Sequence, residues 1–166
     1  MFEIRKLRKD EVEAFKQIRL ESLRDSSSAF GSSYEESLHV DFAARIPEID
    51  NQEAAIFVAE KDDSLVAMIG IMRKDRSKMR HKAHIWGVYV RPAGRQQGLA
   101  RKLMETAIQF GKNMEGVTHL QLTVTSNNST AIKLYESLGF VRYGVESAAV
   151  IIDGIPYDHD LMEKRL

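Results

Sequence analysis

The chain has 166 residues, the length of one ordinary domain, and a hydrophobic fraction of 43%, which is enough for a buried core. Lysine and arginine together number 24, as do aspartate and glutamate, so the formal net charge is zero, which argues against a general nucleic-acid or polyanion binder. Because the chain contains no cysteine, disulfides, cysteine-ligated zinc and a cysteine nucleophile are excluded.

The first residues alternate between apolar and charged side chains, a pattern that predicts a strand and differs from the apolar core of a signal peptide. No apolar run approaches the length of a membrane span, and we expect a single domain over residues 1–166 in a cytoplasmic protein. Asp10 is a candidate N-cap for an amphipathic helix over 11–24, which Asp25 and the following serines end. The positions at helical spacing in this segment are Val12, Phe15, Ile18, Arg19 and Leu23.

The serine-rich segment that follows predicts a loop and then short helical pieces between Tyr34 and Ile49. Phe30, Tyr34 and Glu35 are candidates to line a substrate cleft, because two aromatic rings lie here beside acidic side chains. The alternative is that Phe30 and Tyr34 only fix the loop to the core, as isolated aromatic residues usually do.

A β-hairpin is predicted next, with strands over 54–60 and 65–72 joined by a turn at 61–64. The basic loop over 73–80 either attracts an anion or is a solvated hairpin tip, which is the more frequent meaning of such a run. A further strand over 82–90 leads into the most informative part of the chain.

In that part, the strand ends before Pro92, a polar loop follows, and a helix begins at Leu99. The first N–H groups of a helix have no intrahelical partner and lie at the positive end of its dipole, so such an end binds phosphate. Gly98 leaves room for an anion near the backbone, and Arg95 and Arg101 can add charge-assisted hydrogen bonds. The alternative is an ordinary strand-to-helix loop at the surface.

The rest of the chain predicts a mixture of hairpins and one more helix. The predicted elements are a strand over 120–124, a turn and cap at 126–129, a helix over 130–138, extended chain over 140–144 and a final hairpin of 148–152 with 157–166. Strands and helices alternate at first and hairpins come later, which predicts a mixed α/β class.

Two stretches of this sequence resemble one known family. Val90-x-Pro92-x-x-Arg95-x-x-Gly98-x-Ala100 resembles the acetyl-CoA pyrophosphate signature of the GNAT N-acetyltransferases. Asn128-x-x-Ala131-x-x-Leu134-Tyr135-x-x-x-Gly139-Phe140 resembles a later segment of the same family, in the expected order. Gln96 stands where the family often has Gly or Arg, and Ala100 replaces the commoner Gly. The resemblance implies a GNAT-type mixed, twisted central sheet with splayed central strands, flanked by helices.

The resemblance also implies that acetyl-CoA, as the co-substrate, binds in the wedge between the splayed strands. Backbone groups of Val88 and Val90, with Tyr89 between them, would hold its acetyl and pantetheine parts like an added strand. Asn128 would bind the pantetheine arm, and Tyr135 would lie near the sulfur. The residues implied for the pyrophosphate end are Arg95, Gln96, Gln97, Gly98, Leu99, Ala100 and Arg101.

The catalytic groups implied by the resemblance are Tyr135, Val88 and His84. Tyr135 would protonate the leaving thiolate, and the Val88 N–H would donate to the tetrahedral oxyanion. Related sequences often have Glu at the position of His84, which titrates near neutrality and is a candidate base; the alternative is a structural histidine. His81 and His84 tend to opposite faces of a strand, so we expect no metal site.

The function that these motifs predict is that of an acetyl-CoA-dependent N-acetyltransferase. It would move an acetyl group to a primary amine of a small molecule or protein by direct transfer through a tetrahedral intermediate. Glu35, Glu36 and Asp41 would favour a cationic acceptor. The alternatives are a non-catalytic acyl-CoA-binding sensor or interaction domain, which has no need of Tyr135, and a nucleotide binder, whose motifs the chain lacks. We expect no nucleic-acid or membrane partner, and a homodimer is left open.

Overall fold

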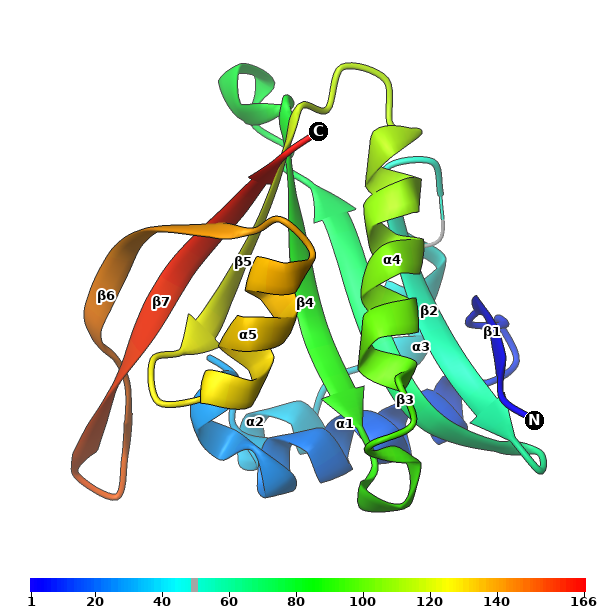
Figure 1. Cartoon of the computed structure of the whole chain (residues 1–166). Coiled ribbons are helices and arrows are strands. Elements are labelled where there is room, and N and C mark those ends of the chain that lie inside the picture. Colours follow the sequence, from blue (N-terminus) through cyan, green and yellow to red (C-terminus); the bar gives the residue numbers. More distant parts are fainter. Residues whose placement is uncertain (49–50) are drawn as a thin grey trace.

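The computed structural model describes residues 1–48 and 51–166, which form one seven-stranded mixed sheet with helices on both faces (Figure 1). The strand order is β1-β2-β3-β4-β5-β7-β6, and β4 and β5 are the one parallel pair among these strands. The strands are β1 Glu3–Lys6, β2 Ala54–Lys61, β3 Ser64–Arg73, β4 Lys82–Val90, β5 His119–Thr125, β6 Val141–Ile152 and β7 Ile155–Arg165.

Two helices cover one face of the sheet and three lie on the other (Figure 1). The first face carries α4 (Leu99–Lys112) and α5 (Ser129–Ser137). The second carries α1 (Val12–Asp25), α2 (Tyr34–Leu38) and α3 (Phe42–Glu48). Single 3₁₀ turns are η1 (Ser27–Ala29), η2 (Ser77–Met79) and η3 (Pro92–Gly94). The predicted mixed α/β class, with a twisted sheet flanked by helices, is confirmed.

The start of α1 differs from the sequence prediction. Asp10 is not the N-cap: the helix begins at Val12, Glu11 is the capping residue, and no side chain caps the helix. The Glu11 carboxylate instead accepts from the Arg8 N–H at 2.8 Å and from the Arg5 guanidinium at 2.8 Å. The hydrogen bond with Arg5 lowers the pKa of Glu11 to about 2. An ion pair with β1 thus lies at the start of α1, and the predicted helical end at Ile49 lies outside the described residues.

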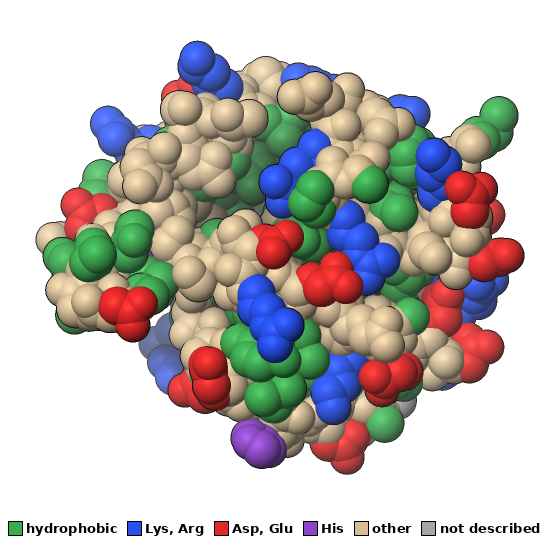
Figure 2. Space-filling model, turned by 90° about the horizontal axis from the view of Figure 1, so that it is seen from below, with side chains coloured by type: hydrophobic (Ala, Val, Ile, Leu, Met, Phe, Trp, Pro, Cys, Tyr) green, Lys and Arg blue, Asp and Glu red, His purple; other side chains and the backbone are tan. Residues whose placement is uncertain are grey.

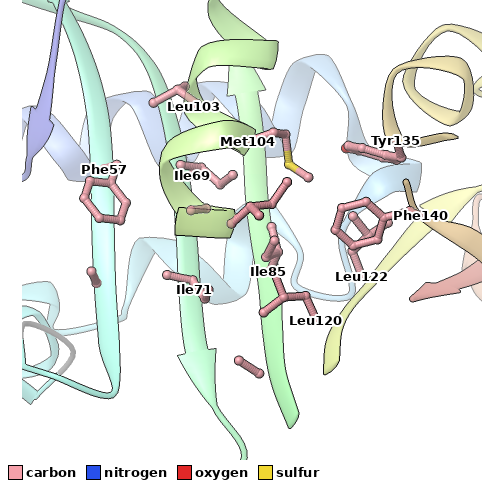
Figure 3. Close-up of a cluster of buried hydrophobic side chains, with 14 of the residues drawn as sticks. Phe57, Ile69, Ile71, Ile85, Leu103, Met104, Leu120, Leu122, Tyr135 and Phe140 are labelled. Carbon is pink, nitrogen blue, oxygen red and sulfur yellow. The ribbon is translucent and has the colours of Figure 1, made fainter. Parts of the chain in front are cut away.

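Each face of the sheet has its own buried cluster of apolar side chains. Under α4 and α5, residues such as Ile69, Ile85 and Leu103 interdigitate, and Tyr135 and Phe140 close the cluster at the α5 end (Figure 3). The alternation of buried and half-buried residues along β4 places its odd-numbered side chains in the cores. The cluster under α1 is formed by Leu7, Phe15, Ile18, Ile46, Ile56, Val58, Leu65, Met68 and Tyr89.

The parallel pairing of β4 and β5 is short. Lys82, Ala83 and His84 pair with residues 119–121, and beyond His84 the two strands have no further pairs. In Figure 1 the two ribbons run together at one end and diverge towards the other. On its other side, β4 stays paired with β3 but carries a bulge at Gly87, whose φ is 67°. The second half of β4 is therefore an open edge within the sheet.

Gly70 on β3 provides the space for the indole ring of Trp86 on β4. The two residues are cross-strand partners, and a Cβ atom at Gly70 would lie 2.1 Å from Cε2 of Trp86. The ring therefore lies against the backbone of β3, and its position depends on the missing side chain.

We predict that Gly70→Ala destabilises the protein by about 1–3 kcal/mol, because the added methyl group must displace the indole. Urea unfolding measures the loss, and the fluorescence of Trp86, the single tryptophan of the chain, reports the displacement. Gly31→Ala is the control, since a Cβ there meets nothing within 4 Å, and its effect should stay below about 0.5 kcal/mol. Equal stability of wild type and Gly70→Ala would contradict this packing.

Candidate functional site

A cleft of about 860 Å³ lies where β4 and β5 have separated. Its walls come from β4, the start of α4, β5, α5 and the end of α1 with the loop after it. Seen from below, the surface is hollowed, with hydrophobic side chains on the floor and Lys or Arg side chains beside the hollow (Figure 2). Both the start of α4 and α1 line this cleft, so an extended ligand can contact both.

The open edge of β4 supplies backbone groups to this cleft. The Arg91 N–H donates to the Val66 carbonyl at 2.9 Å and so points towards β3. Because N–H directions alternate along a strand, the N–H groups of Val90 and Val88 point away from β3, towards the cleft. Arg95 Nε donates to the Val90 carbonyl at 3.0 Å, which agrees with this direction. The edge can therefore pair with an extended ligand that carries amide groups.

The start of α4 concentrates unpaired backbone donors at one end of the cleft. Within the described chain, no backbone N–H from Gln96 to Arg101 has a hydrogen-bond acceptor. Gln96 and Gly98 have positive φ values of 60° and 74°, and a Cβ at Gly98 would meet nothing within 4 Å. Consecutive N–H groups in such a turn form an anion-binding concavity, and the helix dipole adds to it. Arg101, which donates to Ser137 Oγ on α5 at 2.6 Å, places a cation beside it.

On the opposite wall, α5 carries Asn128 and Tyr135. Asn128 caps the helix, since its Oδ1 accepts from the Ala131 N–H at 3.1 Å, and this leaves its amide NH₂ to donate to a ligand. Tyr135 is buried against Phe140 in an edge-to-face contact with 6.2 Å between ring centres. Burial raises the pKa of Tyr135 to about 12, so its hydroxyl stays protonated at neutral pH.

His84 lies at the last paired position of β4, where the cleft begins. Burial, together with the nearby charge of Lys74, lowers the pKa of His84 to about 4. Its imidazole is therefore uncharged at neutral pH and can accept a proton, although a base of low pKa is a weak one.

Most of the residues singled out in the sequence line the cleft; Gln97, Tyr34 and Glu35 do not, nor do Glu36 and Asp41. Those along the wall are Phe30, His84, Val88, Tyr89, Val90, Arg95, Gln96, Gly98, Leu99, Ala100, Arg101, Asn128 and Tyr135. Gln97 turns away and donates from Nε2 to the Ala93 carbonyl at 3.0 Å. Tyr34 stacks under Arg24, with the guanidinium 4.0 Å from its ring centre, and Glu35 is exposed on α2.

The acidic residues near Glu35 also serve the local fold. Glu36 forms a capping box with Ser33 at the start of α2, and Asp41 Oδ1 accepts from the Ala44 N–H at 3.1 Å. Neither lines the cleft, so these carboxylates are not placed to attract a cationic acceptor into it.

Sequence reasoning did not identify Arg19, Asp25 and Trp86 as site residues, yet all three line the cleft. Asp25 accepts from the Tyr89 hydroxyl, whose pKa burial and this contact raise to about 12. The signal for Arg19 was its place among the apolar positions of α1, where a charged side chain faces the core side of an amphipathic helix. Trp86 left no comparable signal, because an aromatic residue is common in any buried strand.

Comparison with known proteins agrees with this geometry. The sequence model of the acetyltransferase (GNAT) family matches residues 14–140, most of the chain. The chain belongs to the GNAT family of acetyltransferases. Human N-acetyltransferase 8 is 28% identical over 97 residues, which are 58% of this chain and 42% of that protein. The putative phosphinothricin acetyltransferase YwnH of Bacillus subtilis is 27% identical over 79 residues, 48% of each protein.

Solved structures share the GNAT fold over the whole chain. A GNAT-family acetyltransferase from Streptococcus pneumoniae superposes with a TM-score of 0.89 at 20% identity, covering 100% of this chain and 99% of that one. The putative acetyltransferase yncA of Salmonella typhimurium, solved with its cofactor acetyl-CoA, gives 0.86 at 21% identity, covering 100% and 94%. This GNAT chain spans less than half the length of each of the two curated relatives named above. Within the described residues, no helix is long and apolar enough to cross a membrane.

The half-buried His84 of this GNAT domain makes its stability depend on pH. The unfolded imidazole binds a proton near pH 6.5 and the folded one only near pH 4, so stability falls as the pH falls between these values. Between pH 7 and pH 5 the loss amounts to about 2 kcal/mol. His84→Gln should lose that much less stability than wild type over this range in urea unfolding. His39→Gln, which alters an exposed imidazole, should behave as wild type; identical pH slopes for wild type and His84→Gln would contradict the burial effect.

Proposed function

We propose that this protein transfers an acetyl group from acetyl-CoA directly to a primary amine. The observation that carries the proposal is the open edge of β4 beyond His84, which faces a cleft with unpaired N–H groups at one end and Tyr135 on the opposite wall. Together these features fit a long ligand with a pyrophosphate at one end and amide groups along its length. Family membership and the acetyl-CoA bound to yncA support the same choice.

The residues that would hold acetyl-CoA follow from the positions of their donors. The N–H groups of 96–101, with Arg101 and Arg95 beside them, would take the pyrophosphate. Val88 and Val90 would pair with the pantetheine amides, and the Asn128 NH₂ would donate to the same arm. Acetyl-CoA supplies an activated thioester, so this chain needs no nucleophile of its own, which suits a protein without cysteine.

Proton transfer on the leaving side falls to Tyr135. When the amine nitrogen forms its bond to the acetyl carbon and the carbon–sulfur bond breaks, the hydroxyl of Tyr135 gives its proton to the thiolate sulfur. Burial keeps this hydroxyl protonated at neutral pH, as an acid must be before the reaction. The Val88 N–H, at the bulge of β4, would donate to the oxygen that gains charge during attack.

Proton transfer on the amine side is assigned to His84, directly or through water. Its ring lines the same cleft and is uncharged at neutral pH, so it has a free acceptor nitrogen. Its low pKa gives it little proton affinity, and we therefore expect the acceptor amine to be largely deprotonated before attack, with activity rising at alkaline pH.

The acceptor is a primary amine of a small molecule or of a protein. The names of the relatives support both classes, since one is a putative phosphinothricin acetyltransferase and another is the catalytic subunit of an N-terminal acetyltransferase B complex from Arabidopsis thaliana.

Two substitutions should separate binding from turnover. Tyr135→Phe should lower kcat by about 10²-fold or more and leave the Kd for acetyl-CoA nearly unchanged, because only the proton donor is removed. Gly98→Glu should abolish acetyl-CoA binding, because it places bulk and negative charge at the anion site. Calorimetry gives the Kd values, and thiol release with a panel of amines gives kcat. Tight CoA binding by wild type without turnover on any amine would instead indicate an acyl-CoA sensor, and an unchanged kcat for Tyr135→Phe would refute its role as the acid.

A further inference from the structure

Arg19 is a cation in the cleft that has no anionic partner. It belongs to α1, on the face of the sheet opposite α4, and lines the cleft. Its Nη1 atom is enclosed and has no hydrogen-bond partner, the one such side-chain atom among the described residues. No ion pair in the described chain includes it either. Burial lowers its pKa to about 10, so it still carries its charge at neutral pH.

Two aromatic rings hold the guanidinium in place without satisfying its N–H groups. Its Cζ lies 4.7 Å from the ring centre of Phe30 and 5.8 Å from that of Trp86. Stacking on ring faces stabilises the cation, but the N–H donors lie in the guanidinium plane and remain available. An enclosed donor without an acceptor is costly, and its presence in a cleft points to a partner that arrives with the ligand. Asp25, the nearby acid of the cleft wall, is engaged by the Tyr89 hydroxyl.

The position of Arg19 relative to β4 limits the size of that partner. A Cβ at Gly87 would lie 3.9 Å from Arg19 Nη1, and Gly87 directly precedes Val88. Under the proposed function, Val88 faces the acyl carbonyl, so the attacking amine must come close to the same point. An anion that reaches Arg19 therefore lies close to the attacking nitrogen, as the acid group of a short amine does.

We propose that the acceptor is an amine that carries its own acid group on the adjacent carbon, an α-amino acid or a close analogue, and that Arg19 binds this acid group. The proposal rests on the proposed acetyl transfer for the identity of the reacting amine. It replaces the cationic acceptor expected from Glu35, Glu36 and Asp41, none of which lines the cleft. Phe30 and Trp86 leave an apolar boundary beside the guanidinium, which favours an apolar side chain on the acceptor.

Matched pairs of acceptors test the proposal on the wild-type protein. Leucine and phenylalanine are compared with leucinamide and phenylalaninamide, in which an uncharged amide replaces the carboxylate. The amine of the amide is the less basic one and is more often deprotonated, so amine ionisation by itself favours the amide. We expect kcat/KM to favour the acid by about tenfold or more, through KM. Equal values or a preference for the amide would overturn the proposal.

Variants of Arg19 identify the source of the preference. Arg19→Gln should remove the acid preference, mainly by raising KM for the acid, and Arg19→Lys should keep part of it because the charge remains. Arg24→Gln is the matched control: Arg24 is an exposed arginine of the same helix, also stacked on an aromatic ring, and lies outside the cleft wall. If Arg19→Gln slows acid and amide equally, the residue only orders Phe30 and Trp86, and the proposal fails.

A binding measurement separates this proposal from the proposed function. Trp86 is the single tryptophan of the chain and lies beside Arg19, so its fluorescence reports a ligand bound there. With CoA present, leucine should change the fluorescence at a concentration about tenfold or more below that needed for leucinamide, and Arg19→Gln should abolish the difference. If no amine is acetylated but this difference is seen, acetyl transfer is wrong and the anion site stands. If amines are acetylated but leucine and leucinamide bind alike, acetyl transfer stands and the anion site is wrong.

Discussion

The parting of β4 and β5 after His84 is the constraint on which the rest of the structure depends. A strand inside a sheet that loses its neighbour exposes N–H and C=O groups that need other partners. Here β4 carries a bulge at Gly87, and Tyr135 of α5 is buried in one cluster with Leu122 and Val124 of β5. The cleft is thus created by the sheet itself and kept open by two packed clusters, one on each face.

The two ends of the cleft carry different chemistry. At the start of α4, backbone donors at 96–101 and the side chain of Arg101 form a site for a multiply charged anion. At the other end, Arg19 lies between two rings as a single enclosed charge. The reactive centre of the proposed transfer would lie where Val88 of β4 and Tyr135 of α5 line the cleft. The cofactor and the acceptor are therefore expected to use different parts of the cleft.

The elements of the fold follow closely from local patterns, because strands such as Lys82–Val90 and helices such as Leu99–Lys112 have clear periodicity and clear ends. The α1 boundary differed by one residue: Glu11 is the N-cap, and its carboxylate bonds to Arg5 and Arg8 and does not cap the helix. The length of the β4–β5 pairing and the enclosure of Arg19 depend on contacts between segments far apart in sequence, which no local pattern contains. The residues of the anion site at the start of α4 and the proton donor Tyr135 could be predicted, because the two sequence motifs contain them individually.

The central claim is that CoA occupies the place of the missing strand beside β4. Residue-resolved amide hydrogen exchange, measured with and without CoA, tests it most directly. We predict that the Val88 and Val90 N–H groups, which face the cleft, slow by about tenfold or more when CoA is bound. The Tyr89 N–H, which faces β3, should change little. CoA binding that leaves Val88 and Val90 exchanging as in the free protein would contradict the claim.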